Sequence, residues 1–152
     1  MSRRNLIQMT REEVDAFLAG RHTMGVATIG QTGQPHLVAM WYGFLDGMPA
    51  FWTYARSQKV QNLRRDPRIT CLVEDGVVYE ELRGVELSGK ATIVEAPDAV
   101  RRVGESISER YVGAIDDAVR EAVVQMGKKR VAVRIDVEQI VSWDHRKLGG
   151  AY

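Results

Sequence analysis

A run of aromatic and polar residues at 51–59, FWTYARSQK, joins a predicted strand to a predicted helix. The N-terminus of a helix presents free backbone amides and the positive end of the helix dipole, and both favour a phosphate. Ser57 adds a hydroxyl group and Lys59 adds a positive charge, while Arg56 and Arg64 would extend the positive zone. The pattern predicts an anion site, although a serine before a helix is equally typical of an ordinary N-cap.

Two adjacent aromatic residues, Trp41 and Tyr42, lie on another predicted strand. Neighbouring residues on a strand face opposite sides of the sheet, so one of the two rings joins the core. The other ring must face a second subunit, a ligand or water. A dimer interface and the wall of a ligand site both fit this pattern.

The C-terminal run at 142–150, SWDHRKLGG, combines one aromatic ring, one acid and several cationic groups. Such a tail fits a segment that closes over a ligand. It fits a solvated basic end equally well, and the composition favours neither interpretation.

Other chemistries lack the residues that they need. His22 and His36 have no partner at a metal-ligand spacing, so no metal site is predicted. The chain has no GxSxG motif, and the adjacent carboxylates at 80–81 diverge on a strand or loop. Cys71, the one cysteine, lies in an apolar run and is interpreted as a small buried residue. The lack of a self-contained catalytic set indicates that a cofactor supplies the chemistry.

The sequence predicts short strands, separated by turn residues, and these strands must position the candidate site residues. Apolar alternation and turn residues predict strands at 24–29, 35–45, 48–53, 68–74, 83–95 and 130–142. Asp46-Gly47 between two of these strands predicts a type I′ hairpin. Residues 77–82 are ambiguous between strand and loop, and residues 143–152 are expected to form a tail.

Four helices are predicted beside the strands. Thr10 and Glu13 form a capping box at the start of the first. The predicted ranges are 10–20, 57–65, 97–111 and 116–126. The sum is a β-barrel with flanking helices, an α+β protein of about six predominantly antiparallel strands rather than a Rossmann sheet. Such a small barrel is filled by its own side chains, so a sizeable ligand must lie outside it, in a groove between subunits.

The composition is that of one globular domain spanning residues 1–152. Its 21 basic and 20 acidic residues give a net charge of +1, without the basic excess typical of proteins that bind nucleic acid or anionic membranes. Because neither a signal peptide nor a membrane-spanning apolar run is found, we expect a cytoplasmic protein with no nucleic acid and no membrane among its partners.

The order of several motifs resembles the pyridoxamine 5′-phosphate oxidase-like superfamily, which has the split β-barrel flavin-binding fold. These motifs lie at 51–53, 57–59, 62–63 and 66–67. The chain is more closely similar to the actinobacterial branch that binds the deazaflavin coenzyme F-420. That likeness rests on GxPH at 33–36, MWY at 40–42, KxxNLRRDP at 59–67 and WDHRKLG at 143–149.

The resemblance implies a homodimer with two cofactor sites at its interface, and it implies which residues bind the cofactor. The ring would be lined by Val38, Ala39, Met40 and Trp41. The ribityl chain would lie near Thr53 and Tyr54. The phosphate would be held by Ser57, Gln58 and Lys59, while Trp143 and residues around Tyr79 would come from the other subunit.

Two departures from the resembled oxidases bear on the reaction. Gln58 stands where those enzymes carry an arginine, and residues 146–149 lack their Arg-Leu-x-Pro substrate pattern, so vitamin B6 oxidation is not expected. The resemblance implies an oxidoreductase that transfers a hydride from reduced F-420 to a small unsaturated or oxidised organic substrate. The alternatives are FMN in the same fold, a non-catalytic F-420 carrier, and a non-flavin ligand such as heme.

Overall fold

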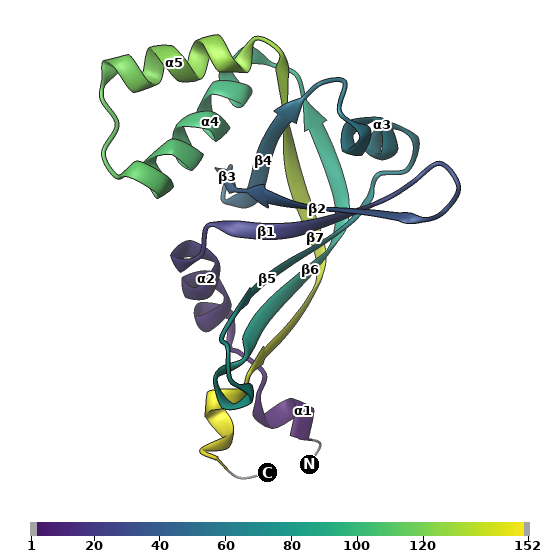
Figure 1. The fold of residues 1–152 in the computed structure, drawn as a ribbon, viewed down its shortest axis with the longest axis vertical. Coiled ribbons are helices and arrows are strands. Elements are labelled where there is room, and N and C mark those ends of the chain that lie inside the picture. The colour runs from purple at the N-terminus through teal and green to yellow at the C-terminus, as the bar shows by residue number, and fades with distance from the viewer. Residues whose placement is uncertain (1–2, 151–152) are drawn as a thin grey trace.

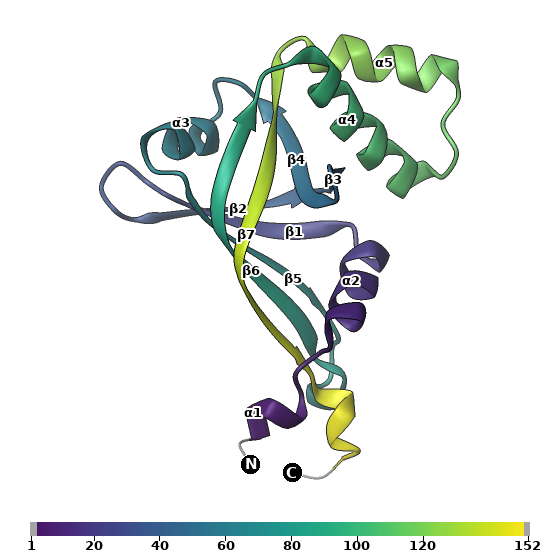
Figure 2. The ribbon, with the colours of Figure 1, turned by 180° about the vertical axis from the view of Figure 1, so that it is seen from behind.

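Within residues 3–150, which the computed structural model describes, an antiparallel sheet of seven strands runs in the order β2-β1-β5-β6-β7-β4-β3 (Figure 1). The strands are β1 (Thr23–Ile29), β2 (Pro35–Trp41), β3 (Gly43–Leu45), β4 (Met48–Tyr54), β5 (Arg68–Asp75), β6 (Arg83–Val94) and β7 (Arg130–Asp144). Figure 2 shows β6 and β7 running from the end near the chain termini to the opposite end of the molecule. The predicted antiparallel split barrel is confirmed in the form of this curled sheet.

Four helices flank the sheet at the predicted positions: α2 (Arg11–Gly20), α3 (Gln58–Arg65), α4 (Pro97–Val112) and α5 (Asp117–Gly127). The capping box is present, because Thr10 Oγ1 accepts a hydrogen bond from the Glu13 amide and Glu13 Oε2 accepts one from the Thr10 amide. The sequence did not predict α1 (Arg3–Leu6) or the single 3₁₀ turns at Tyr79–Glu81 and His145–Leu148. No helix among the described residues is both long and apolar enough to cross a membrane.

The sheet has one strand more than predicted because the expected strand at 35–45 is divided at Tyr42. β2 pairs with β1, whereas β3 pairs with β4 at the other edge of the sheet. Tyr42 and Gly43 are both buried, so the alternation of inner and outer residues breaks there. Gly43 is needed at the bend, since an added Cβ would lie 2.6 Å from Oγ of Ser106 on α4. The two edges of the sheet are therefore consecutive in the chain, and the sheet curls to bring them together.

The structure confirms the predicted hairpin at Asp46-Gly47 and corrects the predicted start of the C-terminal tail. Asp46 and Gly47 both have positive φ, 53° and 77°, as a type I′ turn requires, and the predicted hairpin is confirmed. The expectation that the tail begins at Trp143 is wrong, because β7 continues to Asp144 and Trp143 pairs with Gly84 of β6. The indole ring lies flat against Gly84, where an added Cβ would overlap it.

Two hydrophobic clusters lie on opposite sides of β4. The larger cluster fills the inside of the curled sheet and includes Phe51 and Cys71. The smaller cluster joins the other face of β4 to α4 and includes Trp52 and Val103. Cys71 is buried, as predicted, and burial raises the pKa of its thiol to about 12.

One side chain, Arg110 near the end of α4, ties the break at Tyr42 to the end of α2. Its guanidinium donates hydrogen bonds to the carbonyl oxygens of Tyr42 at 3.0 Å, Ala19 at 3.1 Å and Leu18 at 3.2 Å, and also to that of Arg21. The Tyr42 hydroxyl donates a further bond to Leu18 O at 2.5 Å, and burial raises the pKa of this phenol to about 12. The bonds to Leu18 and Ala19 satisfy carbonyl groups that the last turn of α2 leaves without partners.

Candidate functional site

The predicted anion site is built where β4 ends and α3 begins. The Ser57 amide donates to Tyr54 O at 2.9 Å, and this turn places Ser57 at the N-cap of α3. Lys59 Nζ donates to Thr53 Oγ1 at 3.2 Å, and Thr53 Oγ1 lies 3.4 Å from Ser57 Oγ. The structure therefore brings three predicted residues, Thr53, Ser57 and Lys59, into one cluster.

The cluster carries a positive charge that no acidic side chain balances among the described residues. Lys59 is half-buried, and across residues 3–150 no carboxylate forms a salt bridge with it. Desolvation by burial lowers the pKa of its amine from the ordinary 10.5, because the charged form is held without a counter-ion. The Ser57 side chain makes no capping bond to α3, so it does not occupy the amides of the first turn.

A buried asparagine, which the sequence analysis missed, fixes α3 against the sheet. Asn62 Nδ2 donates to Thr28 Oγ1 on β1 at 3.0 Å, and Asn62 is fully buried. Gln58 Nε2 donates to Asn62 Oδ1 at 2.8 Å, so the amide of Gln58 is committed to this network. The signal for this role was Asn62 itself, since a polar residue between the apolar Val60 and Leu63 must find a partner when buried.

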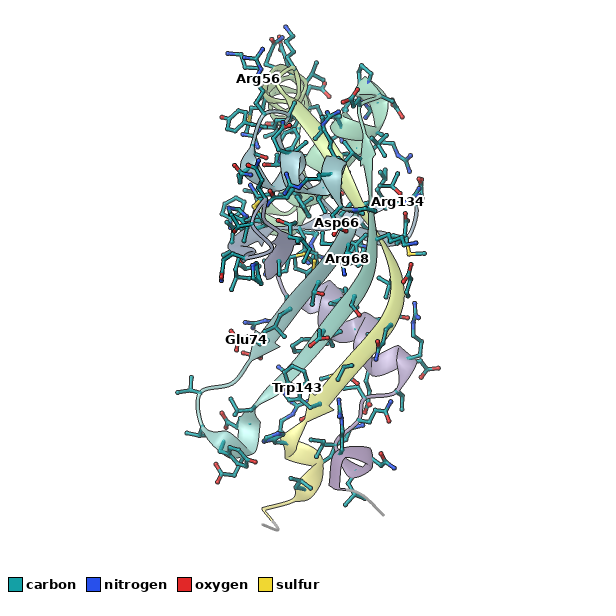
Figure 3. The ribbon with its side chains drawn as sticks, turned by 90° about the vertical axis from the view of Figure 1, so that its right-hand side faces the viewer. Arg56, Asp66, Arg68, Glu74, Arg134 and Trp143 are labelled. Carbon is teal, nitrogen blue, oxygen red and sulfur yellow. The ribbon has the colours of Figure 1, made fainter. Side chains whose placement is uncertain are left out.

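Two arginines that were expected to extend the positive zone differ in their surroundings. Arg64 Nη2 forms a salt bridge with Glu95 Oε1 at 2.6 Å, so its charge is compensated. Arg56 is exposed on the loop before α3, at the end of the molecule labelled in Figure 3. The uncompensated charge of the cluster is therefore that of Lys59, with Arg56 nearby in sequence.

An orphaned polar atom lies near the Asn62 network. His36 on β2 pairs in register with Thr28, and its Nδ1 is buried without a hydrogen-bond partner among the described residues. Because buried polar atoms are nearly always paired, such an atom indicates a place where a ligand supplies the partner. An unpartnered imidazole nitrogen and an uncompensated ammonium together fit a phosphate-bearing ligand with polar groups on its body.

The residues predicted to line the ring alternate between the two faces of β2. Val38 and Met40 are half-buried and pack against the inner core, whereas Ala39 and Trp41 face outward. Trp41 is 57% exposed and Tyr42 is fully buried, which confirms that one ring of the pair joins the core. The Trp41 ring stacks on Tyr111 of α4 with centroids 3.6 Å apart, a partner the sequence did not reveal.

Two predicted residues lie away from the Lys59 cluster within one chain. Tyr54 is exposed and stacks on Arg130, 4.7 Å from ring centroid to guanidinium, on the face of β4 opposite to Thr53. Trp143 lies on β7 toward the end near the chain termini, and Figure 3 shows it far from Arg56 along the long axis. The part of the chain that the structure describes contains no cluster of three or more histidine, cysteine or acidic side chains suited to a metal ion.

An apolar patch covers the outer face of β2, β1 and β5. Leu37 and Leu72 are 70% and 40% exposed, and Gly25 lies between them with its Cβ position 3.8 Å from a Leu37 methyl carbon. Trp41 lies on the same face of β2 as Leu37. Exposed apolar side chains grouped in this way are typical of an interaction surface.

Similarity to known structures agrees with this fold. A conserved hypothetical protein from Mycobacterium tuberculosis is 49% identical, with a TM-score of 0.94 over 100% of this chain and 95% of that chain. An F-420 reductase is 21% identical over 83% of this chain and 94% of that chain, with a TM-score of 0.62. A heme storage protein from Vibrio cholerae is 14% identical over 87% of this chain and 94% of that chain, with a TM-score of 0.65.

The last two likenesses concern the fold alone, because their sequence identities are low. Among curated proteins the sequence finds no match. Residues 10–144, most of the chain, match the pyridoxamine 5′-phosphate oxidase family. The curled antiparallel sheet and this match agree, and the chain belongs to the pyridoxamine 5′-phosphate oxidase family.

Proposed function

We propose that the protein binds coenzyme F-420 and acts as an oxidoreductase on a small unsaturated or oxidised organic substrate. The observation that carries this proposal is the half-buried ammonium of Lys59, which has a hydroxyl partner in Thr53 but no carboxylate partner among residues 3–150. A charged group held in this way is stabilised by an incoming anion, and the phosphate of the coenzyme is such an anion.

The residues of this chain bind and orient the coenzyme. Lys59 Nζ, Ser57 Oγ and the first-turn amides of α3 hold the phosphate, and the Asn62 network keeps α3 in place against β1. The edge strand β2 lies along the ring, with Trp41 fixed by its stacking on Tyr111. The bound coenzyme supplies the hydride, so the protein contributes position and electrostatics.

A homodimer completes this site in the proposal. Figure 3 shows Trp143 far along the long axis from Arg56, which lies on the loop before α3, so a ligand that meets both Trp143 and the start of α3 must touch two copies. The apolar patch of Leu37, Leu72 and Trp41 beside the edge strand β2 is a surface for the second copy. The coenzyme then lies at the interface, where each copy contributes residues to both sites.

The choice of F-420 over FMN rests on Gln58. Its amide is hydrogen-bonded to Asn62, so the phosphate meets one lysine instead of an arginine and a lysine. FMN in the same site is the alternative cofactor, and heme enters the comparison because a protein of this fold stores it. An F-420 carrier without turnover would use the same residues, so only a reaction assay separates it from an enzyme.

The test is a spectroscopic titration of the purified protein with F-420, FMN and heme in turn. We expect saturable binding of F-420, and Lys59→Ala should weaken it by about 10- to 150-fold, the equivalent of losing one hydrogen bond to a charged group. Lys129→Ala is the matched control, because Lys129 is an exposed lysine outside the cluster, and its affinity should equal that of the wild type.

Saturable binding of FMN or heme without binding of F-420 would contradict the cofactor assignment. Equal affinities of Lys59→Ala and the wild type would contradict the phosphate site whichever cofactor binds. Reduction of enones, quinones or nitro compounds by the F-420-loaded protein supports the enzyme, whereas tight binding with no turnover across that panel supports the carrier.

A further inference from the structure

A cavity lies on the other side of β4 from the Lys59 cluster, between α4, α5 and the start of β7. Its volume is about 640 Å³, within the range of cavities that hold small organic molecules. Its apolar wall comes from both helices and consists of Val100, Val123, Val124 and Gly127. Figure 1 shows α4 and α5 packed together beside β4 at this end of the sheet.

The acidic groups at this cavity are already compensated. Glu95 forms a salt bridge with Arg64 at 2.6 Å. Asp98 forms one with Arg101 at 2.6 Å, and Arg101 also pairs with Glu105 at 2.9 Å. Asp98 and Glu105 share the single guanidinium of Arg101, and in the described part of the chain neither forms a salt bridge with the other cations that line the cavity.

The two remaining cations at the cavity, Lys128 and Arg130, have no acidic partner within residues 3–150. Lys128 Nζ donates to the neutral amide oxygen of Gln125 at 2.5 Å. Arg130 forms no salt bridge, and its Nε is buried without a hydrogen-bond partner among the described residues. The cavity therefore combines an apolar wall with two cations that form no salt bridge among the described residues.

Aromatic contacts hold the guanidinium of Arg130 in one orientation. Its central carbon lies 4.6 Å from the Trp52 ring centroid and 4.7 Å from that of Tyr54. Such contacts with the flat face of a guanidinium leave its N–H groups in the plane, where they match the two oxygens of a carboxylate. Since the side chain is already fixed, little conformational entropy is lost when an anion binds.

We propose that this cavity binds a small organic carboxylate with an apolar body, at a site separate from the Lys59 cluster. The carboxylate accepts hydrogen bonds from the guanidinium of Arg130, while Lys128 adds a second positive charge. The apolar body lies against the valines of α4 and α5. A neutral or cationic molecule of the same shape cannot form the ionic hydrogen bonds with Arg130. The charge of a ligand therefore decides whether it binds.

The experiment measures the binding of octanoate, 1-octanol and octylammonium to the full-length protein by calorimetry. We expect octanoate to bind saturably, one molecule per chain, and at least about tenfold more tightly than octanol. Octylammonium should not bind. In ¹H–¹⁵N spectra of arginine side chains, octanoate should shift the Nε–H resonance of Arg130, which a buried N–H makes observable.

Two variants with matched controls locate the site. Arg130→Gln should weaken octanoate binding by about tenfold or more, whereas Arg120→Gln, on the exposed surface of α5, should leave it unchanged. Val124→Glu places a negative charge at a 44%-exposed position of the cavity wall and should also weaken binding, whereas Ala122→Glu on the same helix should not. Because Val124 is partly exposed, this variant keeps the test valid if Arg130→Gln unfolds.

Equal affinities for octanoate and octanol would overturn the proposal, as would wild-type octanoate affinity in Val124→Glu. A loss of octanoate binding in Lys59→Ala instead would place the carboxylate at the other site and overturn it as well. Failure of F-420 to bind would leave this inference standing, since none of its arguments uses the coenzyme.

Discussion

The proton on Lys59 is linked to whatever anion binds beside it. Burial without a counter-ion lowers the pKa of this amine, and a phosphate next to Nζ would favour the charged form and raise the pKa again. By the same linkage, the charge of Lys59 costs the ligand-free protein some stability, and that cost disappears as the pH rises through the lowered pKa toward 10.5. Ligand affinity must change in the opposite direction.

We therefore expect the affinity for F-420 to fall as the pH rises through the lowered pKa of Lys59, at a pH below the ordinary 10.5. The sign follows because only the protonated amine attracts the phosphate, and Lys59 loses its proton earlier than a solvated lysine does. Dissociation constants measured from about pH 7 to about pH 10 check this expectation. Lys59→Arg keeps its charge over the whole range and should give a flat profile. A wild-type profile as flat as that of the arginine variant would contradict the linkage.

Contacts between residues that are close in the sequence could be predicted from the sequence. Thr53, Ser57 and Lys59 lie on one strand end and one helix start, so local rules place them together. The partners of Trp41 and Asn62 were not predictable, because Tyr111 and Thr28 reach them only after the sheet has curled and α4 has packed. No local pattern in the sequence records contacts across such separations.

Among the elements, β4 separates the two candidate sites. Its inward residues Phe51 and Thr53 belong to the inner core and the Lys59 cluster. Its opposite residues Trp52 and Tyr54 face α4, α5 and Arg130. The period of two along one strand was readable from the sequence, whereas the break at Tyr42 was not, because the apolar run at 35–45 continues through it.

The packing of α4 on β4 depends on a glycine. A Cβ on Gly104 would lie 2.6 Å from the Trp52 ring and 2.7 Å from a Val123 methyl carbon. We expect Gly104→Leu to lower the free energy of unfolding by about 1–3 kcal/mol or more, since leucine favours helix but overpacks this contact. Urea denaturation measures the change. Gly20→Leu at the end of α2, where nothing lies within 4 Å, is the control and should cost far less. Equal midpoints for the two variants would refute the close-packing argument.

In the whole molecule, the residues proposed to bind the coenzyme lie in distant parts of the structure, with Trp143 far from Arg56 along the long axis. Local periodicity and turn residues predicted the strands, the helices and the hairpin. The structure confirms that the strands form an antiparallel sheet. The relative position of Trp143 and Lys59 depends on how far β6 and β7 extend, which turn signals alone do not determine. The proposed coenzyme site therefore requires the proposed dimer.

We expect Leu37→Glu combined with Leu72→Glu to convert a dimer into a monomer without unfolding it. Both side chains are exposed, so charges there cost the single chain little but would be buried in the proposed dimer. Sedimentation velocity gives the mass, circular dichroism checks the fold, and F-420 affinity should fall together with the mass. Met126→Glu on α5, also exposed, is the control and should remain dimeric. A folded double variant that stays dimeric would rule out this face as the interface.

The bonds of Arg110 also bear on the order in which the chain folds. Leu18 O has a donor in Tyr42, but Ala19 O finds its donor in Arg110, about ninety positions later, so the end of α2 is completed only after α4 has been synthesised. The early helix and the bend at Tyr42 must wait for α4 before they reach their final form. The sheet itself is closed later still, because β7, which joins β6 to β4, follows α4 in the chain.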